Sequence, residues 1–128
     1  MIVLDTHAWI WWVSEPARLG RIARREIDRA GAIGVPAICC LELATLVSRG
    51  RISLDRPPLR WMHEALALPR VDLLALTPAV AIKAAELPVS FPGDPADRLI
   101  AATAILESAL LITRDERLHE SAAVRTAW

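Results

Sequence analysis

The sequence predicts an α/β fold in which helices cover both faces of a central, mostly parallel sheet of about five strands. Short apolar runs recur along the chain, and each has the length of a strand buried on both faces. Stretches of helical length separate them, and alternating β and α elements of this size imply a parallel sheet. Hydrophobic residues make up 54% of the 128 residues, which suits a largely buried sheet in a single domain spanning residues 1–128.

The first apolar run, residues 2–4, leads directly into Asp5. In open α/β sheets, ligands bind beyond the carboxyl ends of the strands, beside the point where the strand order reverses. If the first strand lies at that point, Asp5 lies at its tip, where a functional site is expected. A short aromatic helix should follow over residues 6–13. We expect its Trp9 and Trp12 in core packing or a self-association surface rather than stacked on nucleic-acid bases.

An arginine-rich helix is expected over residues 19–30, because its apolar residues, Ile22 among them, recur at helical spacing and form one buried stripe. The opposite side carries basic residues interleaved with acids. This row of basic residues fits a solvated helix face, and it also fits a track for phosphate groups. Its members are Arg18, Arg21, Arg25 and Arg29.

A third helix is expected over residues 36–49, after a short strand at residues 32–35, with Pro36 in its first turn. This helix is nearly all apolar, and Glu42 is its only charged residue before the final turn. A lone carboxylate on an apolar helix is costly unless it is paired or coordinated. Glu42 therefore either reaches an arginine or solvent, or contributes to a functional site, and we favour the functional site.

Residues 94–104 read Asp-Pro-Ala-Asp-Arg-Leu-Ile-Ala-Ala-Thr-Ala. Asp94 as the N-cap, a proline in the first turn and Asp97 three residues after the cap describe a helix start. Capping alone does not require two aspartates and an arginine beside a loop. Both carboxylates lie in the first turn, so we expect them to point at the mouth of the sheet.

A further acid follows the strand expected over residues 109–113. In the sequence Thr113-Arg114-Asp115, Asp115 again marks the end of a strand and the start of a helix. The remaining elements are expected as helices over residues 59–68 and 77–86 and as strands over residues 71–76 and 122–127.

Four acidic residues therefore share one position in the predicted fold. Asp5, Asp97 and Asp115 lie at strand C-termini or helix N-termini along one edge of the sheet, and Glu42 reaches that edge from its helix. Clustered carboxylates repel one another, so they persist where a cation holds them together. Mg²⁺ and Mn²⁺ prefer carboxylate and water ligands. Such a site suits phosphodiester hydrolysis, in which the metal lowers the pKa of a bound water and neutralises charge on the phosphate.

Charge and cysteine content exclude some classes of protein. The 15 basic and 15 acidic residues balance, which argues against a protein that coats nucleic acid non-specifically but allows a nuclease with a local site. The adjacent Cys39 and Cys40 are interpreted as small apolar side chains in a reducing compartment. No apolar stretch reaches the ~18 residues of a membrane span, and no basic segment precedes the first strand, so we expect a cytoplasmic protein.

Four of these segments resemble the PIN-domain family, and within it the VapC toxins of bacterial toxin–antitoxin pairs. The resemblance covers nearly the whole chain in order, and the stretch at residues 94–104 is its most specific part. The segments are Met-Ile-Val-Leu-Asp5-Thr-His-Ala-Trp, Glu42 in its apolar helix, Asp94-Pro-Ala-Asp97-Arg-Leu-Ile-Ala-Ala-Thr-Ala and Leu-Ile-Thr113-Arg-Asp115-Glu-Arg-Leu.

The resemblance implies a PIN-like three-layer α/β/α sandwich. It implies an endoribonuclease that depends on Mg²⁺ or Mn²⁺ and hydrolyses structured RNA such as tRNA or rRNA. It also implies a homodimer and a small, VapB-like antitoxin that blocks the acidic site. The acids that match those of the family, and that we assign as catalytic, are Asp5, Glu42, Asp97 and Asp115.

Metal binding is assigned to a slightly different set of residues: Asp5, Asp94, Asp97 and Asp115. Asp94 is an extra acid of this subtype, and it is a ligand, a helix cap or both. Four further residues are expected to support the site. Thr6 and Thr113 could position a water or an acidic side chain, and Arg98 and Arg114 could contact phosphate.

Three other interpretations remain open. A phosphate-receiver domain would need an aspartate after the third strand and a lysine after the last, yet the only lysine, Lys83, lies in a predicted helix. A haloacid-dehalogenase-type phosphatase would need an aspartate where this chain has His7, and we expect His7 to form a hydrogen bond at the helix start rather than to bind metal. A non-catalytic PIN-like binding module would have lost some of the acids, and all four are present.

Overall fold

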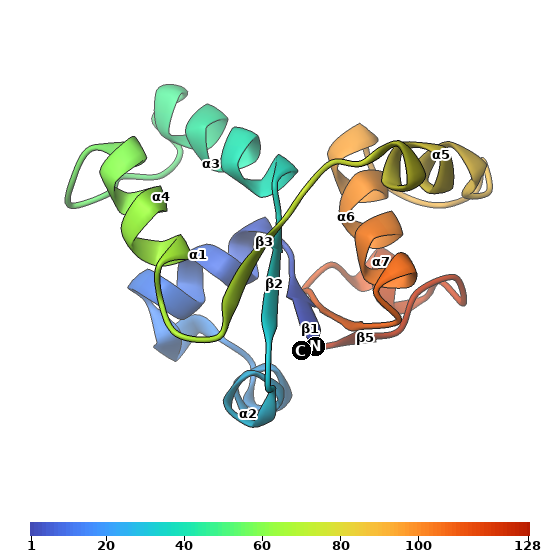
Figure 1. The fold of residues 1–128 in the computed structure, drawn as a ribbon, viewed down its shortest axis with the longest axis horizontal. Helices are drawn as coiled ribbons and strands as arrows, with labels where there is room; N and C mark the ends of the chain where they lie inside the picture. Colours follow the sequence, from blue (N-terminus) through green and yellow to red (C-terminus); the bar gives the residue numbers. More distant parts are fainter.

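The computed structural model describes residues 1–128, and it confirms an α/β fold built on one five-stranded sheet. Every pair of neighbouring strands is parallel, so the sheet is parallel throughout rather than mostly so. In Figure 1, α1 and α4 lie to the left of the central strands, and α5, α6 and α7 lie to the right. Both faces of the sheet are therefore covered, as a parallel sheet requires.

The strand order is β3-β2-β1-β4-β5, which places β1 at the centre. The chain runs outward from β1 to one edge and then returns to build the other edge beside β1. The strand order therefore reverses next to β1, and the carboxyl ends of β1 and β4 flank the position where ligands bind in such sheets. The strands are β1 (Ile2–Leu4), β2 (Ile33–Pro36), β3 (Val71–Leu74), β4 (Leu110–Ile112) and β5 (Thr126–Ala127).

Seven α-helices and one short 3₁₀-helix connect the strands. They are α1 (Thr6–Ser14), η1 (Pro16–Arg18), α2 (Arg21–Arg29), α3 (Ile38–Ser48), α4 (Pro58–Leu66), α5 (Pro78–Glu86), α6 (Pro95–Leu106) and α7 (Glu116–His119). The longest, α6, has 12 residues, and none of the helices combines the length and apolar character needed to span a membrane.

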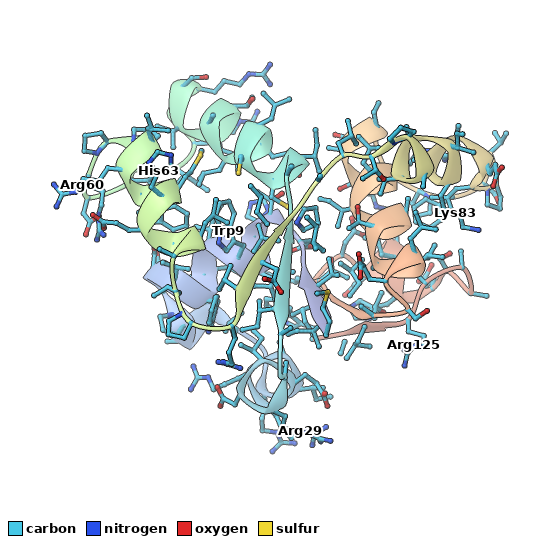
Figure 2. The ribbon with its side chains drawn as sticks, viewed as in Figure 1. Trp9, Arg29, Arg60, His63, Lys83 and Arg125 are labelled. Carbon is cyan, nitrogen blue, oxygen red and sulfur yellow. The ribbon has the colours of Figure 1, made fainter.

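The core forms around β1 and α1. All three residues of β1 are buried, and Trp9 on α1 has no exposed surface. Its indole packs edge-on against Trp61 of α4, with the ring centroids 5.2 Å apart, and Figure 2 shows Trp9 among the side chains between the helices and the sheet. Trp12 is half-buried against the same core. Core packing of the α1 tryptophans is therefore confirmed, and it anchors the helix that begins at Asp5.

Two sequence-based expectations about local structure are wrong. Pro36 is the last residue of β2, opposite Leu74 of β3, and α3 begins only at Ile38. A proline at the end of a strand gives up few ladder hydrogen bonds, so this position tolerates it. Ile22 was expected in the buried stripe of the arginine-rich helix, but it is 44% exposed. Ala23 and Ile27 are the buried residues of α2, and Ile22 lies outside the face that they form.

Candidate active site

A pocket of about 540 Å³ opens at the carboxyl ends of β1 and β4. Ten residues line it, and half of them are acidic. All of the carboxylates predicted from the sequence meet here, although they come from four separate segments. They are Asp5, Glu42, Asp94, Asp97 and Asp115.

Asp5 directly follows β1 and is the N-cap of α1. Its Oδ1 accepts a hydrogen bond from the Ala8 backbone N–H at 2.9 Å, and its own backbone N–H donates to the Ile112 carbonyl of β4 at 3.1 Å. A capping carboxylate satisfies one of the free N–H groups of a helix start. Asp5 is therefore held from both its backbone and its side chain, which gives the carboxylate a defined position.

Glu42 reaches the pocket from α3 and is held by a residue of α1. The Thr6 hydroxyl donates to Glu42 Oε1 at 2.5 Å, a short bond of the kind expected when the acceptor is a carboxylate. Thr6 is buried, so its hydroxyl has little contact with solvent. Of the alternatives left open for Glu42, the structure contradicts an arginine partner and places the carboxylate in the pocket.

Asp94 and Asp97 form a reciprocal capping box at the start of α6. Asp94 Oδ1 accepts from the Asp97 backbone N–H at 3.1 Å, and Asp97 Oδ2 accepts from the Asp94 backbone N–H at 3.4 Å. Gly93 lies against this pair with φ +98, and a Cβ at Gly93 would come within 2.5 Å of Asp97 Cβ. Only glycine fits both the backbone conformation and the space, so Gly93 shapes the position of Asp97.

Asp115 differs from the other acids because it has a basic partner. Arg117 donates to its carboxylate through Nη2 at 2.8 Å and Nε at 3.2 Å. The Arg117 backbone N–H donates to the same carboxylate at 2.9 Å, which caps α7. The buried Thr113 hydroxyl accepts from the Asp115 backbone N–H at 3.1 Å and fixes the turn between β4 and α7.

The electrostatic environment divides these acids into two groups. Burial raises the pKa of Asp5 and of Glu42 above the usual range, and the Asp94 and Asp5 charges add to the effect at Glu42. Burial, followed by the Asp94 and Glu42 charges, raises the pKa of Asp97 to about 6. Hydrogen bonding from Arg117 instead lowers the pKa of Asp115. No basic side chain forms a hydrogen bond or an ion pair with an acid of the first group, so the repulsion among these acids is not relieved by direct pairing.

The four expected supporting residues do not all reach the pocket. Thr6 and Arg114 line it, and Thr113 lies buried directly behind it. Arg98 turns away: its guanidinium donates to the carbonyls of Leu87 at 2.6 Å and Pro88 at 3.2 Å. Arg98 thus ties the loop before α6 to the helix, and its predicted phosphate contact finds no support in this geometry.

The residues of the pocket fit a hard divalent cation. Their donors are carboxylate oxygens, which Mg²⁺ and Mn²⁺ prefer. In this arrangement of side chains, no three acidic, histidine or cysteine residues lie close enough together to hold a metal ion. Mg²⁺ usually keeps several waters and binds through one or two carboxylates, so an open ring of acids is compatible with it. The unrelieved repulsion among the buried acids points to the same kind of ligand.

Several residues of the site were not found from the sequence. His7 lines the pocket and packs 5.4 Å from the Trp11 ring, and it makes no hydrogen bond at the helix start, so that expectation is wrong. Trp11 lines the pocket as well. Gly93 carried one usable signal, since a glycine just before a capped helix often adopts a positive φ. The Arg117 contact had none, because a basic residue two positions after an acid is common.

Comparison with protein-family models matches residues 2–124 to the PIN domain. Ribonuclease VapC22 of Mycobacterium tuberculosis is 43% identical to this chain over 129 aligned positions, which cover 99% of this chain and 98% of that protein. This similarity spans all the carboxylates of the pocket.

Solved structures share the fold at lower identity. VapBC2 from Rickettsia felis, bound to a DNA fragment from its promoter, matches with a TM-score of 0.72 and 18% identity over 99% of this chain and 98% of that one. A toxin–antitoxin complex from Klebsiella pneumoniae gives 0.69 and 19% over 100% and 98%. FitAcB from Neisseria gonorrhoeae gives 0.64 and 26% over 98% and 96%.

Proposed function

The chain belongs to the PIN-domain family, and from this membership we propose that it is a VapC-type ribonuclease, the toxin of a type II toxin–antitoxin pair. Residues 1–128 form one such domain in this proposal. Family membership leaves no room for the phosphate-receiver and phosphatase interpretations. The proposal rests above all on five carboxylates that converge in one pocket of a PIN fold.

The carboxylates take two kinds of role. Asp5, Asp94, Asp97 and Asp115 are proposed to hold Mg²⁺ or Mn²⁺, and Asp94 does so while capping α6. A metal ion bound there would supply Lewis-acid stabilisation of the phosphate and a lowered pKa for an attacking water. Asp5, Glu42, Asp97 and Asp115 are proposed as the catalytic acids.

Glu42 is the acid best placed to handle a proton. Burial raises its pKa, and the Thr6 hydroxyl fixes one carboxylate oxygen. The other oxygen is left to accept a hydrogen bond from a water in the pocket, and a raised pKa makes the carboxylate a stronger base. Thr113 holds the turn that carries Asp115, and Arg114 provides positive charge beside the acids.

The activity is tested with purified protein freed of any partner. We expect it to cut structured RNA, such as bulk tRNA or rRNA, when Mg²⁺ or Mn²⁺ is added, and to stop with EDTA. Asp5→Asn keeps an oxygen for the cap on Ala8 but removes the charge, and it should lower the cleavage rate at least about a hundredfold. Cutting by Asp5→Asn at the wild-type rate would contradict the assignment of the site.

Two protein partners belong to the proposal. A small VapB-like antitoxin should block the pocket. A homodimer should cover exposed apolar residues on α3, on and after β3, and on α5: Leu41, Leu73, Leu76 and Ile82, each between 53% and 62% exposed. Native mass spectrometry after co-expression with the neighbouring small reading frame tests both. A bare monomer under all conditions would contradict them.

A further inference from the structure

One side of the pocket is formed by an indole that carries two guanidinium groups. The guanidinium carbon of Arg18 lies 4.6 Å from the centroid of the Trp11 ring, and that of Arg114 lies 5.7 Å from it. Both distances fall within the range of cation–π contacts. We name Trp11, Arg18 and Arg114 the Trp11 shelf. The three residues come from α1, η1 and the turn after β4, so only the folded chain brings them together.

The Trp11 ring supports the arginines and is not itself a stacking surface. Only 8% of Trp11 is exposed, which leaves no room for a base on its ring. Trp128 packs edge-on against it, with ring centroids 5.7 Å apart. Gly20 in turn lies so close that a Cβ there would be 2.6 Å from the Trp128 carbonyl carbon. The indole is therefore fixed from behind. Trp11 and Arg114 line the pocket, and Arg18 lies against the same indole.

The donors of both arginines remain available. Arg114 lines a pocket with five carboxylates, yet it forms no hydrogen bond or ion pair with any of them. Arg18 has one ion pair, with Glu15 at 3.6 Å, and both side chains are more than half exposed, so solvent weakens it. Many other arginines are engaged: Arg98, for example, is bound to loop carbonyls and Arg117 to Asp115. Arg114 therefore presents unused N–H groups beside the acids, and Arg18 presents them from the same indole.

We infer that the Trp11 shelf binds the phosphate backbone of the RNA strand next to the bond that is cut. The inference rests on the proposed ribonuclease function. An acidic pocket repels a polyanion, so a substrate of this charge needs cationic contacts at the rim. A guanidinium stacked on an aromatic ring keeps its edge free, and that edge matches a phosphate in bidentate geometry.

Binding of a fluorescein-labelled single-stranded RNA oligonucleotide, followed by fluorescence anisotropy with Mg²⁺ in an Asp5→Asn background, tests the inference without cleavage. Arg18→Gln and Arg114→Gln should each weaken binding roughly threefold or more at moderate salt. Each should also reduce the slope of log K against log salt by about 0.7, which is the loss of one phosphate contact on a single strand. Lysine at either position restores the charge without the planar stack and should recover only part of the affinity.

Arg29→Gln is the matched control. The Arg29 side chain is 67% exposed and forms a loose ion pair with Glu26 at 3.8 Å. Replacing it removes one exposed positive charge, as Arg18→Gln does. The sequence allowed a phosphate track that included Arg29, but the structure places this residue away from the site. It lies at the end of α2, on the lower side of the molecule in Figure 2, and α2 leads into the amino end of β2, opposite the pocket. Binding and salt slope should stay at the reference values. A general effect of surface charge would move this variant as much as the other two.

The outcomes separate the inference from the function on which it rests. Wild-type protein that cuts RNA, together with unchanged binding by both glutamine variants, overturns the Trp11 shelf and leaves the ribonuclease standing. Protein that neither cuts nor binds RNA overturns both. Trp11→Phe serves as the variant of the indole itself, because it keeps an aromatic ring and a larger change could prevent folding. It should weaken RNA binding less than the loss of either arginine. Equal loss in Arg29→Gln also overturns the inference, because the contact would then be non-specific.

Discussion

The acids of the pocket fall into two regions with opposite electrostatics. On one side, Asp5, Glu42 and Asp97 are withdrawn from solvent, and burial raises the pKa of each. On the other side, Asp115 stands at the start of α7, and Arg117 lowers its pKa. Carboxyl groups at the same edge of one sheet therefore have pKa values shifted in opposite directions. Position in the fold brings the acids together, but the neighbours of each acid decide its charge.

This difference indicates what each region contributes. The withdrawn acids, Asp5, Glu42 and Asp97, destabilise the protein when they are ionised, because their charges are desolvated and repel one another. A bound cation would relieve that repulsion, so the desolvated charges favour metal binding. Asp115 is already paired with Arg117, so it contributes little to the electrostatic preference for a metal ion. It can still act as a metal ligand if Arg117 shifts its contact.

The largest expected effect comes from the backbone beneath Asp97. Gly93→Ala places a Cβ within 2.5 Å of Asp97 Cβ at a residue with φ +98, so both the backbone and the acid must move. We expect a loss of more than about 1 kcal/mol in unfolding free energy. A fall in the cleavage rate of at least about tenfold should accompany it, since misplacement near an active site is costly. Urea denaturation and RNA cleavage measure the two effects.

Gly31→Ala provides the control for this prediction. A Cβ at Gly31 meets no atom within 4 Å, and its φ is not in the left-handed region. The substitution should leave cleavage unchanged and stability unchanged or slightly raised. If Gly93→Ala changes stability and cleavage as little as Gly31→Ala does, the position of Asp97 does not depend on the loop before α6. The environment of Asp97 would then differ less from that of Asp115 than the structure indicates.

The sequence predicted the positions of the acids better than their environments. Asp5 and Asp115 were found because each follows a buried strand, and Asp94 and Asp97 because a capping box has fixed spacing. These are local patterns, and the parallel sheet brings them to one edge. Pro36 was misplaced because a proline after a short apolar run fits both the end of a strand and the first turn of a helix.

Contacts between distant segments could not be read from the sequence. The Trp11 shelf joins residues almost a hundred positions apart, and no spacing rule connects Arg18 with Arg114. Arg98 looked like a phosphate contact because it follows Asp97 directly, yet the helix turns its side chain toward loop carbonyls. The division of the acids into two groups depends on such contacts, so it became visible only in the fold.

The stability of the protein should change with pH in opposite directions for the two groups of acids. Asp97 has a folded-state pKa of about 6 against an ordinary value of 3.8, so the folded state holds a proton that the unfolded state releases between these values. Metal-free protein should therefore lose stability as pH rises from about 4 through 6. Asp97→Asn should remove part of this loss of stability. At neutral pH its free energy of unfolding should exceed that of the wild type by on the order of 1 kcal/mol, after allowance for solvent screening of a half-buried group.

Asp115→Asn should have the opposite effect. Its lowered pKa adds stability above the ordinary value of 3.8, and that contribution disappears as pH falls through the folded-state pKa. Loss of the charge should therefore slightly destabilise the protein at neutral pH. Urea midpoints measured from below pH 3 to pH 8 cover both curves, and saturating Mn²⁺ should flatten the wild-type curve. Effects of the same sign in the two variants would contradict the division into two regions.

The smallest expected effect concerns the cause of the low pKa at Asp115. Arg117→Gln removes the guanidinium but keeps the backbone N–H that caps α7. Thermal unfolding should hardly change, because an exposed ion pair contributes little. The pKa of Asp115, followed by NMR titration of its carboxyl carbon, should rise toward 3.8. Arg60→Gln removes a comparable exposed pair with Glu64 and should leave Asp115 unchanged. An unchanged Asp115 in Arg117→Gln would assign the low pKa to the capping N–H instead, and the difference between the regions would then lie in the backbone.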